Sequence, residues 1–152
     1  MYLKPFSEHT YTIKMARSIT LSFWYPHTQA QVWLAITNAE AVSQWLMPCD
    51  LKPEVGFEFT FKTKPYPGFD GTVHCKVLAV SEPDYFAYSW SGGSLKDTKV
   101  SFSLSASKGG TRLDFEHSGF EGFLNNLIVR RILASGWRKR ILSKQLKHYL
   151  SK

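Results

Sequence analysis

The chain has 152 residues, of which 43% are apolar and 15% aromatic, and its formal net charge is +7. This is the length of one domain that buries roughly 70% of its unfolded surface, and no stretch reaches the ~20 apolar residues of a membrane span. The first 16 residues lack the apolar run of a secretory signal. We therefore expect an N-terminal extension, residues 1–16, followed by one domain, residues 17–152.

The first half of the domain begins with a strand and continues with two short helices. Residues 17–25 alternate between apolar and polar side chains, as a half-buried strand does, and Pro26 ends the alternation. Thr28 and Gln31 have the spacing of a capping box, which predicts a helix start. Asn38 can cap a second short helix, which Pro48 would end.

Two-residue alternation returns after Gly56 and predicts a meander of antiparallel strands. In the last of them Leu113, Phe115 and His117 share one face of the strand, and Glu116 lies on the other. Glycine, proline or aspartate separates the successive runs. The expected strands span residues 57–62, 71–80, 85–91, 99–106 and 111–117.

Helical spacing follows Gly122, with Leu142, Leu146 and Leu150 on one face. The apolar stripes before and after Gly136 do not line up, which predicts a break in the helix there. The expected fold is α+β: a curved antiparallel sheet of about six strands, two short helices after the first strand, and a long C-terminal helix across the concave face. A twisted sheet and a straight helix match over only part of their length, so a cavity between them is expected.

Strand parity and helix position together predict which side chains face this cavity. The abundant aromatic residues could equally be ordinary core packing, and by count alone packing is the safer interpretation. The predicted ligand-binding residues are Phe59, Phe61, Val73, Cys75, Tyr88, Trp90, Phe102, Phe115, His117, Trp137 and Ile141.

A set of short motifs, weak singly but specific in their order and spacing, extends over nearly the whole chain. They are Val32-Trp33, Trp45-Leu46, Glu54-Val55-Gly56, Asp70-Gly71, Glu82-Pro83, Tyr88-Ser89-Trp90, Gly110-Thr111-Arg112-Leu113, Glu116-His117-Ser118-Gly119-Phe120 and Gly136-Trp137. With these motifs the chain resembles the activator of heat-shock protein 90 ATPase homologues, within the START-like (SRPBCC) helix-grip superfamily.

The resemblance implies a helix-grip fold with a hydrophobic cavity, in a superfamily that binds lipids, polyketides or hormones and occasionally catalyses. The eukaryotic co-chaperones of this family carry a further N-terminal domain, and the segment before Arg17 is too short to be one. A heat-shock chaperone is therefore a possible partner but not the expected one.

Catalytic and metal-binding motifs are missing from the sequence. There is no Gly-x-Ser-x-Gly elbow, no phosphate-binding loop, no dinucleotide fingerprint and no histidine pair with metal-ligand spacing, so we expect no cofactor and no metal. His117 could act as an acid or base with Asp70 or Glu116, but Glu116 points to the opposite face of the strand. We expect no catalytic residue. Cys49 and Cys75 are too few for a disulfide framework, which favours free thiols in the cytoplasm.

The positive charge is concentrated at the C-terminal end, where residues 130–152 hold eight Lys or Arg and no Asp or Glu. Arg140, Lys144 and Lys147 form a stripe opposite the leucines. A solvated face near a helix C-terminus explains this stripe most simply, a weak contact with an anionic membrane surface comes second, and nucleic-acid binding is disfavoured.

These patterns favour binding over catalysis. The predicted function is to bind a small hydrophobic ligand (a lipid, a polyketide or a flavonoid-like aromatic) between the sheet and the last helix, for transport, sensing or stress response. Two alternatives stay open at this stage: an enzyme of the polyketide cyclase or aromatase kind, and a chaperone-associated interaction module.

Overall fold

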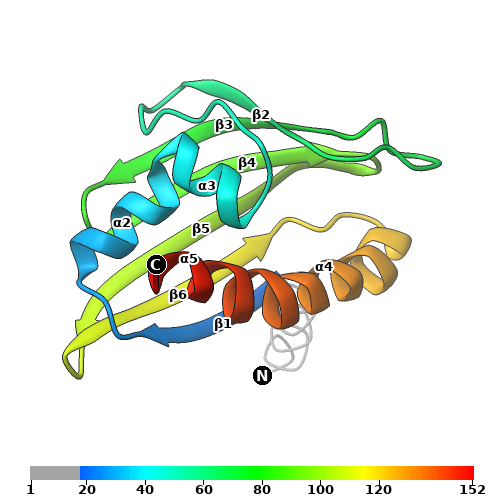
Figure 1. Cartoon of the computed structure of the whole chain (residues 1–152). Coiled ribbons are helices and arrows are strands. Elements are labelled where there is room, and N and C mark those ends of the chain that lie inside the picture. The colour runs from blue at the N-terminus through cyan, green and yellow to red at the C-terminus, as the bar shows by residue number, and fades with distance from the viewer. Residues whose placement is uncertain (1–17) are drawn as a thin grey trace, which may run out of the picture.

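A curved antiparallel sheet of six strands carries the fold, in the order β1-β6-β5-β4-β3-β2 (Figure 1). The computed structural model describes residues 18–152, so the predicted extension, residues 1–16, lies outside the described residues. Every pair of neighbouring strands is antiparallel, which confirms the meander. The strands are β1 (Ser18–Tyr25), β2 (Glu58–Lys62), β3 (Thr72–Ser81), β4 (Tyr85–Gly92), β5 (Leu95–Ser107) and β6 (Gly110–Ser118).

Strand β5 is longer than its alternation indicates. It begins at Leu95 rather than at residue 99. Asp97, inside the added segment, has a left-handed backbone (φ 51°), and the pairing with β4 shifts register between Trp90 and Gly92. A bulge of this kind interrupts the period-two pattern from which a strand is recognised. The two strands stay paired on both sides of the bulge, so the strand is longer than the alternation predicts.

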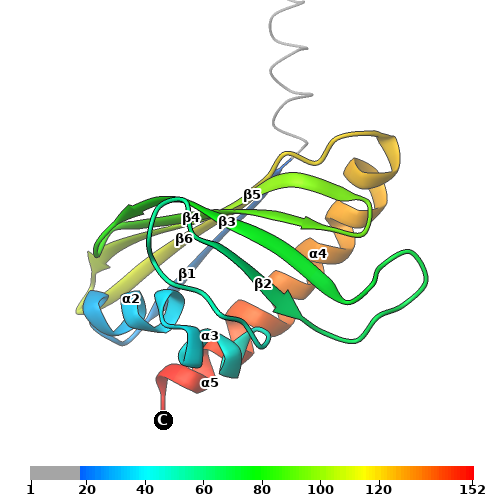
Figure 2. The ribbon, with the colours of Figure 1, turned by 90° about the horizontal axis from the view of Figure 1, so that it is seen from above.

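The two short helices lie where their caps predict. The Thr28 side chain accepts from the Gln31 amide at the start of α2 (Gln29–Thr37), and the Gln31 side chain accepts from the Thr28 amide, which completes the capping box. Asn38 caps α3 (Ala39–Trp45) by accepting from Ala41. Both helices turn apolar side chains toward the sheet, so they close one end of the concave face (Figures 1 and 2).

The C-terminal helix crosses the concave side of the sheet as one rod (Figure 2). It consists of a π-helical stretch η1 (Asn125–Val129), α4 (Arg130–Gly136), a second π-helical stretch η2 (Trp137–Leu146) and α5 (Lys147–Leu150). The predicted break at Gly136 is wrong, since Gly136 keeps helical dihedral angles (φ −63°, ψ −49°). The i→i+5 turns that follow rotate the later apolar stripe relative to the earlier one without interrupting the helix.

Tyr25 ties this helix to the first strand. Its hydroxyl is buried and donates to the carbonyl oxygen of Leu142 at 2.9 Å, and burial raises the pKa of the phenol. We expect Tyr25→Phe to lower the free energy of unfolding by about 1 kcal/mol, because the buried hydrogen bond to the Leu142 carbonyl is lost. Urea unfolding measures this loss. The exposed Tyr66→Phe serves as the control, and equal stability of the two variants would contradict the assignment.

Candidate functional site

A cavity of about 650 Å³ opens between the C-terminal helix, the β2–β3 connection and the β4–β5 turn. Its walls are mostly apolar, and the polar exceptions are a threonine, a serine, one arginine and the hydroxyl of a tyrosine. This volume lies within the range of small-molecule sites in proteins. The lining residues are Met47, Thr63, Tyr66, Pro67, Gly68, Phe69, Val73, Trp90, Gly92, Gly93, Ser94, Leu95, Val129, Ile132, Leu133 and Arg140.

Glycines shape the sheet side of the cavity. Gly93 has φ 57° in the tight β4–β5 turn, a conformation that L side chains rarely adopt. A Cβ on the preceding Gly92 would lie 3.2 Å from the Phe69 ring, so a side chain there would push this ring away from the turn. The Phe69 ring in turn packs on Tyr66, with centroids 5.1 Å apart. This contact holds two aromatic side chains at the mouth.

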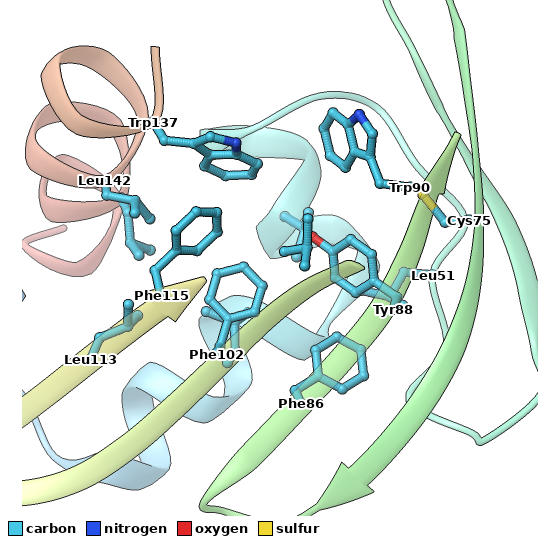
Figure 3. Packing of buried hydrophobic residues seen from close by; sticks show 14 of the residues in the cluster. Leu51, Cys75, Phe86, Tyr88, Trp90, Phe102, Leu113, Phe115, Trp137 and Leu142 are labelled. Atoms are coloured by element: carbon cyan, nitrogen blue, oxygen red, sulfur yellow. The ribbon is translucent and has the colours of Figure 1, made fainter. Parts of the chain in front are cut away.

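Of the predicted ligand-binding residues, Val73 and Trp90 line this cavity. Eight others lie beside it in one buried core, and Figure 3 shows Cys75, Tyr88, Phe102, Phe115 and Trp137 among them. Ile141 is partly buried against that core. Their role as ligand contacts stays a prediction. The core members are Phe59, Phe61, Cys75, Tyr88, Phe102, Phe115, His117 and Trp137.

Sequence reasoning missed most of the cavity wall, including Tyr66, Phe69 and Leu133. Tyr66 and Phe69 belong to a proline-glycine turn, where period-two parity assigns no face. A signal was nevertheless present, because two aromatic residues in an exposed turn are unusual where no partner or cavity receives them. Leu133 was missed because it lies in α4, before η2, and the apolar positions on the two sides of η2 do not follow one regular helical spacing.

His117, at the end of β6, is fully buried and its ring packs on Trp90, Phe120 and Trp137. Its Nε2 lies 2.9 Å from the hydroxyl of Thr98 on β5. That hydroxyl donates its single hydrogen to the carbonyl oxygen of Trp90 at 2.6 Å, so it can only accept from His117. The neutral ring therefore carries its proton on Nε2, which leaves Nδ1 as a bare acceptor.

Two buried polar atoms at this place have no hydrogen-bond partner among residues 18–152: His117 Nδ1 and the Trp137 indole N–H. The two side chains are 0% and 1% exposed, and their ring centroids lie 6.3 Å apart. Leaving such atoms unpaired costs roughly 1–3 kcal/mol each. We call these two side chains the His117/Trp137 pair.

Burial lowers the pKa of His117 to about 3, against 6.5 for an ordinary histidine. Between these values the unfolded chain binds a proton that the folded chain does not, so stability falls as the pH drops below 6.5. We expect a loss of up to about 1.4 kcal/mol per pH unit, measured by urea unfolding, and a shallower slope in His117→Phe. An unchanged slope in His117→Phe would contradict this.

Within residues 18–152, no group of three or more His, Cys, Asp or Glu side chains is placed to hold a metal ion, and no helix is long and apolar enough to cross a membrane. The free cysteine Cys75 is buried, which raises the pKa of its thiol, and Cys49 is partly buried. Burial raises the pKa of the Cys49 thiol as well, and a raised pKa disfavours the anionic form that nucleophilic chemistry uses.

A curved antiparallel sheet that closes on one long helix around an apolar cavity is a helix-grip, START-like fold. The family model of the activator of Hsp90 ATPase homolog 1-like proteins matches residues 26–151. The chain belongs to this family. Among curated proteins, none matches the chain.

Solved structures share the fold over nearly their whole length. A crystal structure of a Mesorhizobium loti protein is 26% identical, with a TM-score of 0.78 over 89% of this chain and 97% of that one. A Bacillus halodurans protein is 22% identical, with a TM-score of 0.74 over 88% and 96%. A Plasmodium falciparum protein described as an Hsp90 activator is 16% identical, with a TM-score of 0.66 over 83% and 91%.

Proposed function

We propose that the chain binds a small, largely apolar ligand in the cavity between sheet and C-terminal helix, for transport, sensing or a stress response. The cavity itself is the observation that carries the proposal: about 650 Å³ with walls formed mainly by apolar side chains such as Val73, Leu95 and Leu133. An apolar wall favours a lipid, a polyketide or a flavonoid-like aromatic. Free thiols at Cys49 and Cys75 support a cytoplasmic location.

Binding is favoured over a cyclase or aromatase activity. An enzyme of that kind needs polar groups that converge on the reacting atoms, and the polar side chains of this wall are few: Thr63, Tyr66, Ser94 and Arg140. His117 lies behind Trp90, outside the wall.

The test is an NMR titration with laurate, naringenin and 1-naphthol, which represent the three chemical classes. At least one should produce saturable shifts at the amides of Val73 and Leu95 and at the Trp90 indole. Shifts confined to exposed side chains, or none with any of the three, would overturn the proposal.

A second candidate function, contact with an anionic membrane, is favoured by the exposed side chains at the start of the C-terminal helix. Phe123 is 76% exposed and Ile132 65%, and Ile132 also lines the cavity, so this surface is continuous with the mouth. We call it the apolar helix edge; its members are Phe123, Leu124, Leu127, Ile128 and Ile132.

Basic residues accompany this edge. Arg130 and Arg131 lie within it, and the exposed stripe of Arg140, Lys144 and Lys147 continues along the same helix. Apolar side chains flanked by cations are typical of helices that lie in the interface of anionic bilayers. We propose that the edge and the stripe together hold the cavity mouth against such a bilayer, from which an apolar ligand can enter.

Vesicle co-sedimentation tests the membrane contact. Binding should be stronger to vesicles of phosphatidylcholine with phosphatidylserine than to phosphatidylcholine alone, and the double variant Phe123→Ser/Ile128→Ser should bind several-fold less. Leu34→Ser, which changes an exposed leucine on α2, is the matched control. Equal sedimentation of both variants, or binding of the edge to purified Hsp90 but not to vesicles, would overturn this second proposal.

A further inference from the structure

The His117/Trp137 pair presents one unpaired acceptor and one unpaired donor in the same buried place. His117 Nδ1 can only accept, because Thr98 fixes the proton on Nε2, and the indole N–H of Trp137 can only donate. A group that satisfies both atoms must itself donate to the imidazole and accept from the indole. A hydroxyl does both with one oxygen, whereas a ketone, an ether or a carboxylate lacks the hydrogen.

The spacing of the rings fits a single bridging oxygen. Two hydrogen bonds of about 2.9 Å each span up to about 5.8 Å between their nitrogen atoms. The ring centroids of His117 and Trp137 are 6.3 Å apart, with the planes at 81°. This separation places the two rings side by side in the core, and one oxygen bridges them where their unpaired nitrogens face the same space.

Trp90 connects this place to the cavity. Its ring lines the cavity and packs on both members of the pair, with centroids 5.5 Å from His117 and 5.7 Å from Trp137. Figure 3 shows the Trp137 nitrogen on the edge of its ring that faces Trp90. Trp90 is the one of these three rings that lines the cavity, so it separates the pair from the cavity.

We propose that the pair is a specificity site for the hydroxyl group of the bound ligand, so that the chain selects apolar molecules with an alcohol or phenol at one end. The hydroxyl oxygen accepts from Trp137 and its hydrogen is donated to His117 Nδ1. This inference rests on the proposed function, because it assigns the polar end of a ligand whose apolar part fills the cavity.

Three probes of nearly equal size separate the hydrogen bonds from the apolar contacts: 1-naphthol, 1-methoxynaphthalene and 1-methylnaphthalene. In calorimetric or fluorescence titrations 1-naphthol should bind at least about tenfold more tightly than 1-methylnaphthalene, because a site built around a hydroxyl leaves polar atoms unpaired with an analogue that lacks it. The methoxy compound can accept but not donate, so it should fall near 1-methylnaphthalene.

Variants assign the preference to the pair. His117→Phe and Trp137→Phe should each reduce the ratio of the two affinities toward one while 1-methylnaphthalene still binds. Trp45→Phe is the matched control: Trp45 is equally buried, but its indole N–H already donates to Ala35 at 2.8 Å, and the ratio should stay at the wild-type value. Without ligand, Trp137→Phe should lower the urea midpoint less than Trp45→Phe, since only the latter loses a hydrogen bond.

A spectroscopic measurement on the unaltered chain covers the case in which a variant does not fold. The ¹⁵N signals of His117 Nδ1 and the Trp137 indole should shift with 1-naphthol and not with 1-methylnaphthalene. Equal affinity for the three probes, with silent signals at the pair, would overturn the hydroxyl site and leave the ligand-binding function standing. Binding of none of the three would overturn both.

Discussion

Phe115→Ala is expected to lower the free energy of unfolding by about 3–5 kcal/mol. The side chain is 1% exposed and lies on β6, where it packs edge-on against Phe102 (5.4 Å between centroids) and contacts Trp137 on the helix at 4.4 Å between centroids. Its removal leaves a cavity that the two neighbouring rings cannot fill, because strand pairing and the helix backbone hold them in place (Figure 3). Urea unfolding followed by tryptophan fluorescence measures the loss.

Phe123→Ala is the matched control for this prediction. The same atoms are removed, but the Phe123 side chain is 76% exposed, so the change should stay within about 0.5 kcal/mol. If the two variants lost similar stability, the helix would not be held to the sheet through Phe115 and the described core would be wrong.

Leu133→Trp is expected to abolish measurable ligand binding, or to weaken it at least about tenfold, while the protein still folds. Leu133 is partly buried and lines the cavity, so a larger ring there occupies the space of a ligand rather than space already filled by the core. Because the added atoms enter an existing void, we expect a change in stability of no more than about 1 kcal/mol. Titration with 1-naphthol measures the affinity, and urea unfolding the stability.

Leu34→Trp controls for the new indole. Leu34 is 62% exposed on α2 and does not line the cavity, so this variant should bind as the wild type does. Unchanged 1-naphthol binding in Leu133→Trp would place the ligand elsewhere on the protein.

Local patterns predict the elements well wherever one face of an element is buried throughout. Phe115 and His117 on β6 face the core as their alternation indicates, and Thr28 and Asn38 start helices because their side chains satisfy free amides. The start of β5 was not predicted, because the single left-handed residue Asp97 breaks the alternation of inward and outward side chains there. The continuous helix at Gly136 was not predicted either, because a π-helical turn shifts an apolar stripe in the same way as a break in the helix does.

The candidate site is less predictable than the fold. Parity shows which side chains of a strand face inward, but it cannot distinguish an inward residue that touches other side chains from one that borders empty space. Phe102 and Val73 illustrate the difference: both face inward, and only Val73 borders the cavity. The empty space depends on where the β2–β3 connection and the first turns of the helix lie, which are tertiary features.

The most direct test of ligand binding in this cavity is a measurement of intermolecular nuclear Overhauser effects between 1-naphthol and the methyl groups of the isotopically labelled protein. We expect contacts from the naphthol ring protons to the methyls of Val73, Leu95 and Leu133, which line the cavity from β3, the start of β5 and α4. Contacts only to the exposed methyls of Leu124 and Ile128, or none at saturating naphthol, would contradict it.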